Sequence, residues 1–129
     1  MNKKILIVLA NYYKEISDGL LKSALKNVPK SSYIKIIRVP GVFEIPVTIS
    51  KTSQKFDAFL ALGCVIKGET PHFDFISQAT TNAIMELSII KKKPIGNGII
   101  TCLNMKQAKA RTNKGAEAAI AITSILKQK

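Results

Sequence analysis

The chain has 129 residues, of which 47% are hydrophobic, and it carries a formal net charge of +12. This length predicts a single domain spanning residues 1–129, and the apolar fraction is large enough for a buried core. The chain contains no uninterrupted run of about eighteen apolar residues, so no membrane-spanning helix is expected.

The positive charge comes almost entirely from lysine, which raises the question of nucleic-acid binding. The lysines are spread along the chain. The one cluster, Lys91-Lys92-Lys93, falls where a helix is predicted to end, and the helix dipole favours cations there. No basic and aromatic stacking motif accompanies this cluster. We therefore expect no nucleic-acid partner.

The N-terminal segment has a charged stretch, 1–4, before an apolar run, 5–10, an order that secretory signals share. The run is short and no small-residue cleavage site follows it, so a buried first strand is the better interpretation. Cys64 and Cys102 lack the spacing of a metal or redox motif and suit a reducing compartment. The sequence thus predicts a cytoplasmic protein with no metal site.

Apolar runs alternate with segments of helical periodicity along the chain. The run over 5–9 predicts a strand covered on both faces. Apolar residues at helical spacing over 16–28 predict a helix that Pro29 ends. An isoleucine-rich strand is predicted over 33–39, and Pro40-Gly41 stops it.

The alternation continues to the C-terminus. A short helix is predicted from about 43 to 53, where Pro46 is tolerated because it lies in the first turn. The remaining predicted elements are a strand over 58–66, a helix over 73–90, a strand over 95–103 and helices over 106–111 and 115–126. Such regular alternation predicts a parallel sheet with right-handed crossovers, and therefore a three-layer α/β sandwich.

In a sheet of this kind, ligands bind beyond the carboxyl ends of the strands. One such position is the loop that leads from the strand ending at Ile66 into the next helix. Thr70 is a suitable helix N-cap and Pro71 a suitable first helical residue, so the loop over 68–70 predicts an anion site suited to phosphate.

His72, the only histidine in the chain, would lie in the first turn of that helix. The helix dipole disfavours an imidazolium there and leaves a neutral ring able to exchange protons. A capping or solvent-facing histidine is the simpler alternative. Its position after a phosphate-type loop favours a functional role.

Three further positions carry candidate binding groups. Glu44 opens the helix after Pro40-Gly41, where it could complement the helix dipole or accept hydrogen bonds from substrate hydroxyls. Tyr12 and Tyr13 follow the first strand and could stack on a planar ring, although aromatic residues there more often pack. Arg111, one of two arginines, lies close to Lys114 and could bind phosphate with its rigid fork or simply be a solvated helix end.

Together these segments resemble the lumazine synthase family from Ile5 to about Ile125. The strongest parts are GVFEIP at 41–46 and the long central motif ALGCVIKGETPHFDF at 61–75. They are supported by NGIIT at 97–101, QAKAR at 107–111 and NKGAEAA at 113–119. The resemblance implies a sheet in the flavodoxin-like strand order 2-1-3-4.

The resemblance also implies roles for individual residues. An aminouracil substrate would be bound by Tyr12, Val42, Phe43, Glu44, Cys64, Val65, Ile66 and Asn97. A phosphate would be bound by Gly68, Glu69, Thr70, Arg111 and Lys114, and His72 would transfer protons. Members of the family need no metal or cofactor for the reaction, so none is expected here.

The implied reaction joins a ribitylaminouracil to a four-carbon ketone phosphate. The free amine adds to the ketone, water leaves, phosphate is eliminated, and ring closure with loss of a second water gives 6,7-dimethyl-8-ribityllumazine. Holding two reactants together is worth up to about 7–11 kcal/mol, and proton transfer adds a factor of roughly 10²–10⁴.

Family members form pentamers with active sites between subunits, and some build larger shells, so a pentamer or an assembly of pentamers is expected, with riboflavin synthase as a further candidate partner. Three features depart from many members. Asn97 stands where a phenylalanine is common, the segment between Arg111 and Lys114 is shorter, and the N-terminus lacks an extra strand. The last two bear on assembly size.

Two alternative functions remain. An archaeal-type riboflavin synthase has a similar fold but takes lumazine itself and would have no use for a phosphate loop with Arg111. A non-catalytic flavin- or RNA-binding protein would bind its ligand without turnover, with RNA affinity that falls steeply with salt.

Overall fold

The structure, a computed structural model, describes residues 2–128 and contains one parallel sheet of four strands. The strands lie in the order β2-β1-β3-β4, and every neighbouring pair is parallel, which confirms the expected order 2-1-3-4. The elements are β1 (Lys4–Ala10), α1 (Lys14–Leu25), β2 (Tyr33–Val39), the 3₁₀ turn η1 (Val42–Glu44), α2 (Ile45–Thr52), β3 (Ala58–Ile66), α3 (His72–Lys91), β4 (Ile95–Cys102), α4 (Met105–Ala110) and α5 (Lys114–Leu126).

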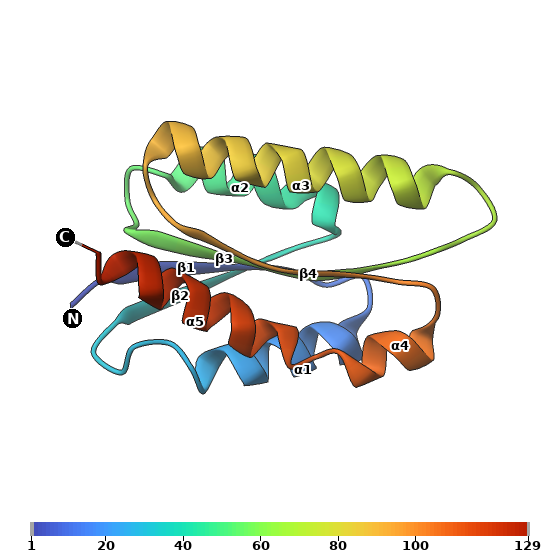
Figure 1. Cartoon of the computed structure of the whole chain (residues 1–129), viewed down its shortest axis with the longest axis horizontal. Coiled ribbons are helices and arrows are strands. Elements are labelled where there is room, and N and C mark those ends of the chain that lie inside the picture. Colours follow the sequence, from blue (N-terminus) through green and yellow to red (C-terminus); the bar gives the residue numbers. More distant parts are fainter. Residues whose placement is uncertain (1, 129) are drawn as a thin grey trace.

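The helices cover both faces of the sheet, as Figure 1 shows. Helices α2 and α3 form one outer layer, and α1, α4 and α5 form the other. This arrangement confirms the three-layer αβα sandwich. The loops that follow all four strands therefore meet at one edge of the sheet, its carboxyl edge.

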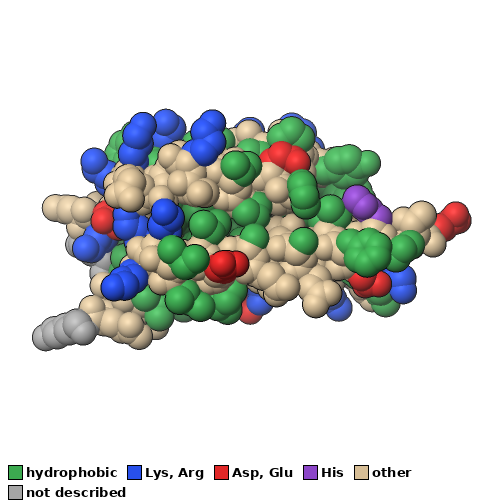
Figure 2. All heavy atoms as spheres, turned by 90° about the horizontal axis from the view of Figure 1, so that it is seen from above, with side chains coloured by type: hydrophobic (Ala, Val, Ile, Leu, Met, Phe, Trp, Pro, Cys, Tyr) green, Lys and Arg blue, Asp and Glu red, His purple; other side chains and the backbone are tan. Residues whose placement is uncertain are grey.

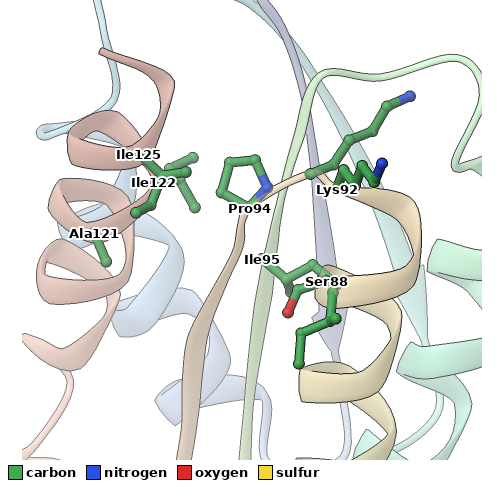
Figure 3. Close-up of a pocket in the computed structure, with 9 residues that line it drawn as sticks. Ser88, Lys92, Pro94, Ile95, Ala121, Ile122 and Ile125 are labelled. Carbon is green, nitrogen blue, oxygen red and sulfur yellow. The ribbon is translucent and has the colours of Figure 1, made fainter. Parts of the chain in front are cut away.

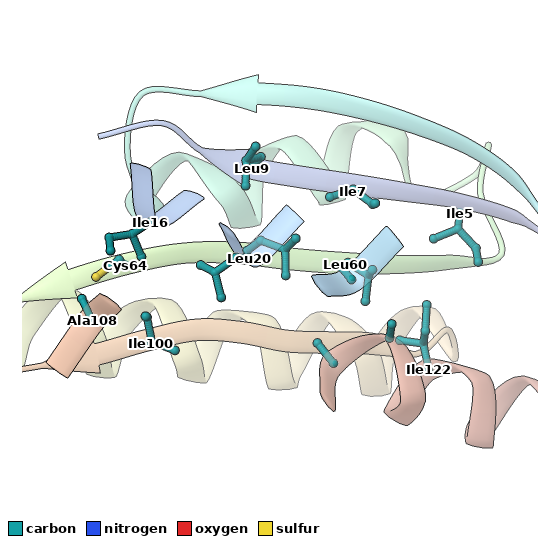
Figure 4. Packing of buried hydrophobic residues seen from close by; sticks show 14 of the residues in the cluster. Ile5, Ile7, Leu9, Ile16, Leu20, Leu60, Cys64, Ile100, Ala108 and Ile122 are labelled. Atoms are coloured by element: carbon teal, nitrogen blue, oxygen red, sulfur yellow. The ribbon is translucent and has the colours of Figure 1, made fainter. Parts of the chain in front are cut away.

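The two central strands are buried on both faces. Residues 5–10 of β1 and 58–64 of β3 are buried, as a continuous apolar run predicts. Alternate side chains of these strands enter different clusters. Ile5, Ile7 and Leu9 pack toward α1 and α5 (Figure 4), whereas Leu6 and Val8 pack in the cluster that contains α2 residues.

The edge strands differ from the central ones. Most side chains of β2 are exposed or half-buried, and on β4 the side chains of Asn97 and Thr101 are exposed. Edge strands lack a neighbour on one side, so their outer side chains remain available to a ligand or another chain.

One predicted helix end is wrong. Helix α1 ends at Leu25, four residues before Pro29. The Ala24 carbonyl accepts hydrogen bonds from the N–H groups of both Asn27 and Val28, and the Asn27 side chain donates to the Ser23 carbonyl at 2.9 Å. These bonds close the helix locally before the proline is reached.

The second predicted helix is divided. The segment expected as one helix from about residue 43 begins as the 3₁₀ turn η1 and continues as α2. Pro46 is the second residue of α2, so it lies in the first turn as predicted. Helix α1 begins at Lys14, two residues before its predicted start. The other predicted bounds differ from the observed ones by one residue at most, within the usual uncertainty of helix and strand ends.

Candidate functional site

A cavity of about 260 Å³, hereafter the Tyr12 cavity, opens at the carboxyl edge of the sheet. Its wall combines residues that follow three different strands with the start of α3. The lining residues are Tyr12, Tyr13, Gly41, Val42, Phe43, Cys64, Val65, Ile66, His72 and Ile76. Seven of the predicted site residues thus meet in one place, although they are spread over sixty positions of the chain.

The two tyrosines after β1 have different environments. The Tyr12 side chain is 75% exposed, while Tyr13 is half-buried against the core cluster. Their rings meet edge to face, with centroids 4.9 Å apart and planes at 78°. Burial, followed by Tyr12 and Cys64, raises the pKa of Tyr13. Tyr13 therefore packs, and Tyr12 presents an open ring.

The turn after β2 is closed by Glu44. Its Oε1 accepts a hydrogen bond from the Gly41 N–H at 3.0 Å, and the Glu44 N–H donates to the Gly41 carbonyl at 3.2 Å. This reciprocal pair shapes the turn so that Val42 is buried and Phe43 is 61% exposed. Glu44 itself is half-buried and does not line the cavity, so its first role here is structural.

The end of β3 supplies the floor of the cavity through Cys64, Val65 and Ile66. Cys64 is only 6% exposed and lies close to the side chain of Cys102. The register explains this contact, because Ile66 pairs with Cys102 and Cys64 pairs with Ile100, which places the two thiols on one face of the sheet. Burial, and then Cys102, raise the pKa of Cys64 to about 12.

His72 lines the cavity, and both His72 and the preceding loop 68–70 are exposed. The N–H groups of this loop make no hydrogen bond to the described part of the chain, residues 2–128, so they remain available to an anion. The loop residues themselves do not line the Tyr12 cavity.

The predicted start of α3 needs a correction. Pro71, not Thr70, is the N-cap, because the Pro71 carbonyl already accepts the N–H groups of Asp74 and Phe75. Thr70 instead receives a long bond, 3.4 Å, from the N–H of His72. His72 is the first residue of α3, so its predicted place in the first helical turn is confirmed. In Figure 2 the histidine lies among hydrophobic side chains at one end of the molecule, far from the lysines gathered at the other.

A second cavity, of about 470 Å³ and hereafter the Arg111 cavity, opens beside the edge strand β4. It shares no lining residue with the Tyr12 cavity. Its wall is formed by Asn97, Ile99, Ile100, Thr101, Ala110, Arg111, Asn113, Lys114 and Glu117. The structure therefore places ten of the predicted site residues in two separate cavities, whereas Glu44 and the loop 68–70 line neither.

The wall of the Arg111 cavity contains three charged side chains, those of Arg111, Lys114 and Glu117. Within residues 2–128 the Arg111 guanidinium makes no ion pair or hydrogen bond, whereas Lys114 lies 3.6 Å from Glu117. The Asn97 side-chain oxygen accepts the N–H of Ile99 at 3.1 Å, which leaves the amide NH₂ as its donor group. A free guanidinium next to an ammonium group suits an anionic ligand.

Helix α4 carries Arg111 at its C-cap and is itself held by a reciprocal cap. The Asn104 side chain accepts the N–H of Gln107 at 2.9 Å, and the Gln107 side chain accepts the N–H of Leu103 at 2.8 Å. This pattern differs from a capping box in one respect, because the Gln107 side chain accepts the N–H of Leu103, the residue before the N-cap, and not that of Asn104.

Several lining residues were not predicted from the sequence: Tyr13 as a wall residue, Gly41, Ile76, Thr101, Asn113 and Glu117. For Ile76 a signal was present, because it lies four residues after His72 and therefore on the same face of α3. Glu117 lies three residues after Lys114 on α5, and the same rule applies.

A third cavity, of about 450 Å³, lies between the C-terminal parts of α3 and α5 and includes Lys92, Pro94 and Ile122 (Figure 3). It is next to the beginning of β4 and therefore at the amino edge of the sheet. Ligands of doubly wound sheets bind at the opposite edge, so this cavity is not the candidate site. The described residues contain no cluster of three or more metal-binding side chains and no helix long and apolar enough to cross a membrane.

The fold and the Tyr12 cavity together define a class: an α/β protein whose small-molecule site lies at the carboxyl edge of a parallel sheet, with an apolar wall and one imidazole. Comparison with known proteins gives the family. The family model for 6,7-dimethyl-8-ribityllumazine synthase matches residues 2–129.

Individual relatives agree with this match. The chain is 42% identical to the 6,7-dimethyl-8-ribityllumazine synthase of Bartonella bacilliformis, covering 99% of this chain and 93% of the relative. It is 43% identical to the enzyme of that name from Bartonella tribocorum, covering 99% and 94%. It is 38% identical to 6,7-dimethyl-8-ribityllumazine synthase 1 of Rhodopseudomonas palustris, covering 98% and 85%. The chain belongs to the 6,7-dimethyl-8-ribityllumazine synthase family.

Proposed function

We propose that this protein is a transferase of riboflavin biosynthesis. It condenses 5-amino-6-(D-ribitylamino)uracil with 3,4-dihydroxy-2-butanone 4-phosphate to form 6,7-dimethyl-8-ribityllumazine, phosphate and two waters. The family match over nearly the whole chain carries this proposal. The convergence of predicted site residues around the Tyr12 cavity supports it.

The Tyr12 cavity is the proposed aminouracil site. The exposed Tyr12 ring would stack on the pyrimidine, and Val42, Phe43 and the end of β3 would hold its edges and faces. Oε1 of Glu44 already accepts the Gly41 N–H, and the other carboxylate oxygen would accept hydrogen bonds from the ribityl hydroxyls.

The ketone phosphate would lie beside the reacting amine of the aminouracil, next to His72. The unpaired N–H groups of Gly68, Glu69 and Thr70 would face its phosphate, together with Arg111 and Lys114. His72 would move protons while the amine adds and the phosphate leaves.

The separation of the two cavities within one protomer leads to a proposal about assembly. The Arg111 cavity opens at the edge strand β4, which has a neighbouring strand on one side only. The Tyr12 cavity opens at the carboxyl edge of the sheet and shares no lining residue with it. We propose that neighbouring copies bring the Arg111 cavity of one protomer to the Tyr12 cavity of the next, in a pentamer or an assembly of pentamers. Asn97 would then contact the aminouracil bound to the adjacent copy.

The location and a further partner are also proposals. Both cysteines are free and buried, which suits the reducing cytoplasm. A riboflavin synthase would consume the lumazine product and is the proposed partner.

The deciding experiment mixes the purified protein with both substrates and follows lumazine fluorescence and released phosphate together. Equal amounts of both products are expected, and neither should form when one substrate is omitted. A second reaction supplies lumazine alone. Riboflavin formed there, with no product from the first mixture, would replace this proposal with a riboflavin synthase activity.

A further inference from the structure

The junction between α4 and α5, residues 111–113, and the first turn of α5 are tied by one hydroxyl group to helix α1, which is distant in the sequence. Ser23 on α1 lies 2.7 Å from the Thr112 carbonyl and 3.1 Å from the Leu20 carbonyl, and its proton is assigned to the shorter contact. The same oxygen accepts the N–H of Ala116 at 3.1 Å. Ser23 therefore bonds to the backbone one residue after Arg111 and two residues after Lys114.

Two glycines bring α1 and the junction into direct contact around these bonds. A Cβ at Gly115 would lie 2.1 Å from the Leu20 carbonyl oxygen, and a Cβ at Gly19 would lie 2.9 Å from the Thr112 side chain. Such distances leave no room for the junction to slide along α1. The close packing makes the position of Ser23 well defined.

The side chain of Arg111 has no other anchor. Its guanidinium forms no ion pair or hydrogen bond within residues 2–128, so the backbone of the junction sets where this side chain begins and which region it can reach. Ser23 does not line the Arg111 cavity and cannot touch a ligand there. Its influence on that cavity must pass through Thr112 and Ala116.

We propose that Ser23 is a positioning residue for Arg111 and Lys114, which it places for phosphate binding through the Thr112 carbonyl and the Ala116 amide. The inference rests on the proposed role of these two side chains in binding the ketone phosphate. The Thr112 carbonyl also accepts the Gly115 N–H at 3.3 Å, and the Ala116 N–H also donates to the Asn113 carbonyl at 3.0 Å. Removing the Ser23 hydroxyl therefore breaks only their bonds to α1, and the junction gains freedom relative to that helix.

The test compares Ser23→Ala with Thr123→Ala. The control also loses one hydroxyl bonded to a backbone carbonyl, that of Ala119 at 2.8 Å, but it lies on α5 beyond the junction. For Ser23→Ala the Michaelis constant of the ketone phosphate should rise about threefold to tenfold, while that of the aminouracil and kcat stay within about twofold. Thr123→Ala should leave all three unchanged, and Ser23→Thr, which keeps a hydroxyl, should recover part of the loss.

A rise of both Michaelis constants by the same factor would overturn the inference, because a general loss of structure has that effect. A readout independent of the reaction uses inorganic phosphate, titrated while the amide signals of residues 111–116 are followed by NMR. Ser23→Ala should bind phosphate more weakly and exchange its Ala116 amide faster. Unchanged exchange and unchanged phosphate binding would refute positioning even if the proposed function had failed in the substrate assay.

Discussion

The wall of the Tyr12 cavity contains one side chain that is exposed to solvent and one that is buried. His72 is exposed at the opening, whereas Cys64 is 6% exposed at the floor. A proton-transfer group must reach both substrate and solvent, and the position of His72 permits this. The Cys64 thiol is held in an apolar environment that disfavours its charged form.

The variant His72→Ala tests the proposed proton transfer. Turnover should fall by roughly 10²–10⁴, the factor that a positioned acid or base contributes. The free energy of unfolding should change by no more than about 0.5 kcal/mol, because the side chain is exposed and the backbone bond to Thr70 remains. Steady-state kinetics and urea unfolding measure both quantities. Unchanged turnover would remove His72 from the mechanism.

The raised pKa of Cys64 predicts how stability depends on pH. In the unfolded chain the thiol has its ordinary value of 9.0, and in the folded protein the value is about 12. Below the lower value both states keep the proton, and between the two values only the unfolded state loses it. The contribution of this group is therefore fully present below pH 9.0 and is lost as pH rises toward 12.

Urea unfolding at several pH values across this window measures the effect. The free energy of unfolding should fall more steeply with pH for the unmodified protein than for Cys64→Ala, which lacks the titrating thiol. The lysines titrate in both proteins and cancel in the comparison. Parallel pH profiles would show that the Cys64 thiol ionises as easily in the folded state as in the unfolded one.

At the scale of elements, small residues determine how closely α5 approaches the sheet. Gly115, Ala116, Ala118 and Ala119 of this helix are all buried. A Cβ at Gly96 on β4 would lie 2.5 Å from the carbonyl oxygen of Ala118, a backbone atom that cannot move without the helix. This close approach places the α4–α5 junction, and with it Arg111, beside the edge strand.

Gly96→Ala should therefore move α5 away from β4 and lower the free energy of unfolding by about 1–3 kcal/mol or more. Gly68→Ala is the matched control, because a Cβ there meets nothing within 4 Å. Its free energy of unfolding should change by less than about 0.5 kcal/mol. Urea unfolding of both variants checks this, and similar values for the two would contradict the close packing of α5.

At the scale of the whole molecule, the division of the site between two cavities predicts that activity needs more than one copy. Light scattering under assay conditions should give an assembly of several chains, and an active monomer would defeat the shared site. Complementation is the sharper test. His72→Ala and Arg111→Ala are each expected to be weakly active, but co-expressed chains should regain part of the activity.

The physical reason is that a mixed assembly contains some sites with an intact His72 from one copy and an intact Arg111 from the next. Each variant expressed alone and purified in the same way serves as the control. If each site were built within one chain, no mixture of the two variants could restore it, and the activity would equal the average of the two.

Local pattern was a reliable guide to the sheet. The strands over 33–39 and 58–66 have the predicted bounds, and β1 and β4 differ by one residue at an end. A continuous apolar run fits a strand that is covered on both faces, so these runs also predicted that β1 and β3 are buried on both faces. Pattern was less reliable at helix ends, where Asn27 closes α1 before Pro29 and Pro71 replaces Thr70 as the N-cap of α3. Single hydrogen bonds decide such ends.

The sequence alone determined the three-layer fold, because the fold depends on the order and periodicity of apolar segments. The same pattern predicted the carboxyl edge as the binding edge and the residues that approach it. The tertiary structure decided how those residues are grouped. The separation of Arg111 from the Tyr12 cavity, the contact of Cys64 with Cys102 and the bond from Ser23 to Thr112 join residues far apart in the chain. Such contacts depend on how closely helices pack on the sheet, and the spacing of residues along the chain carries no measure of that distance.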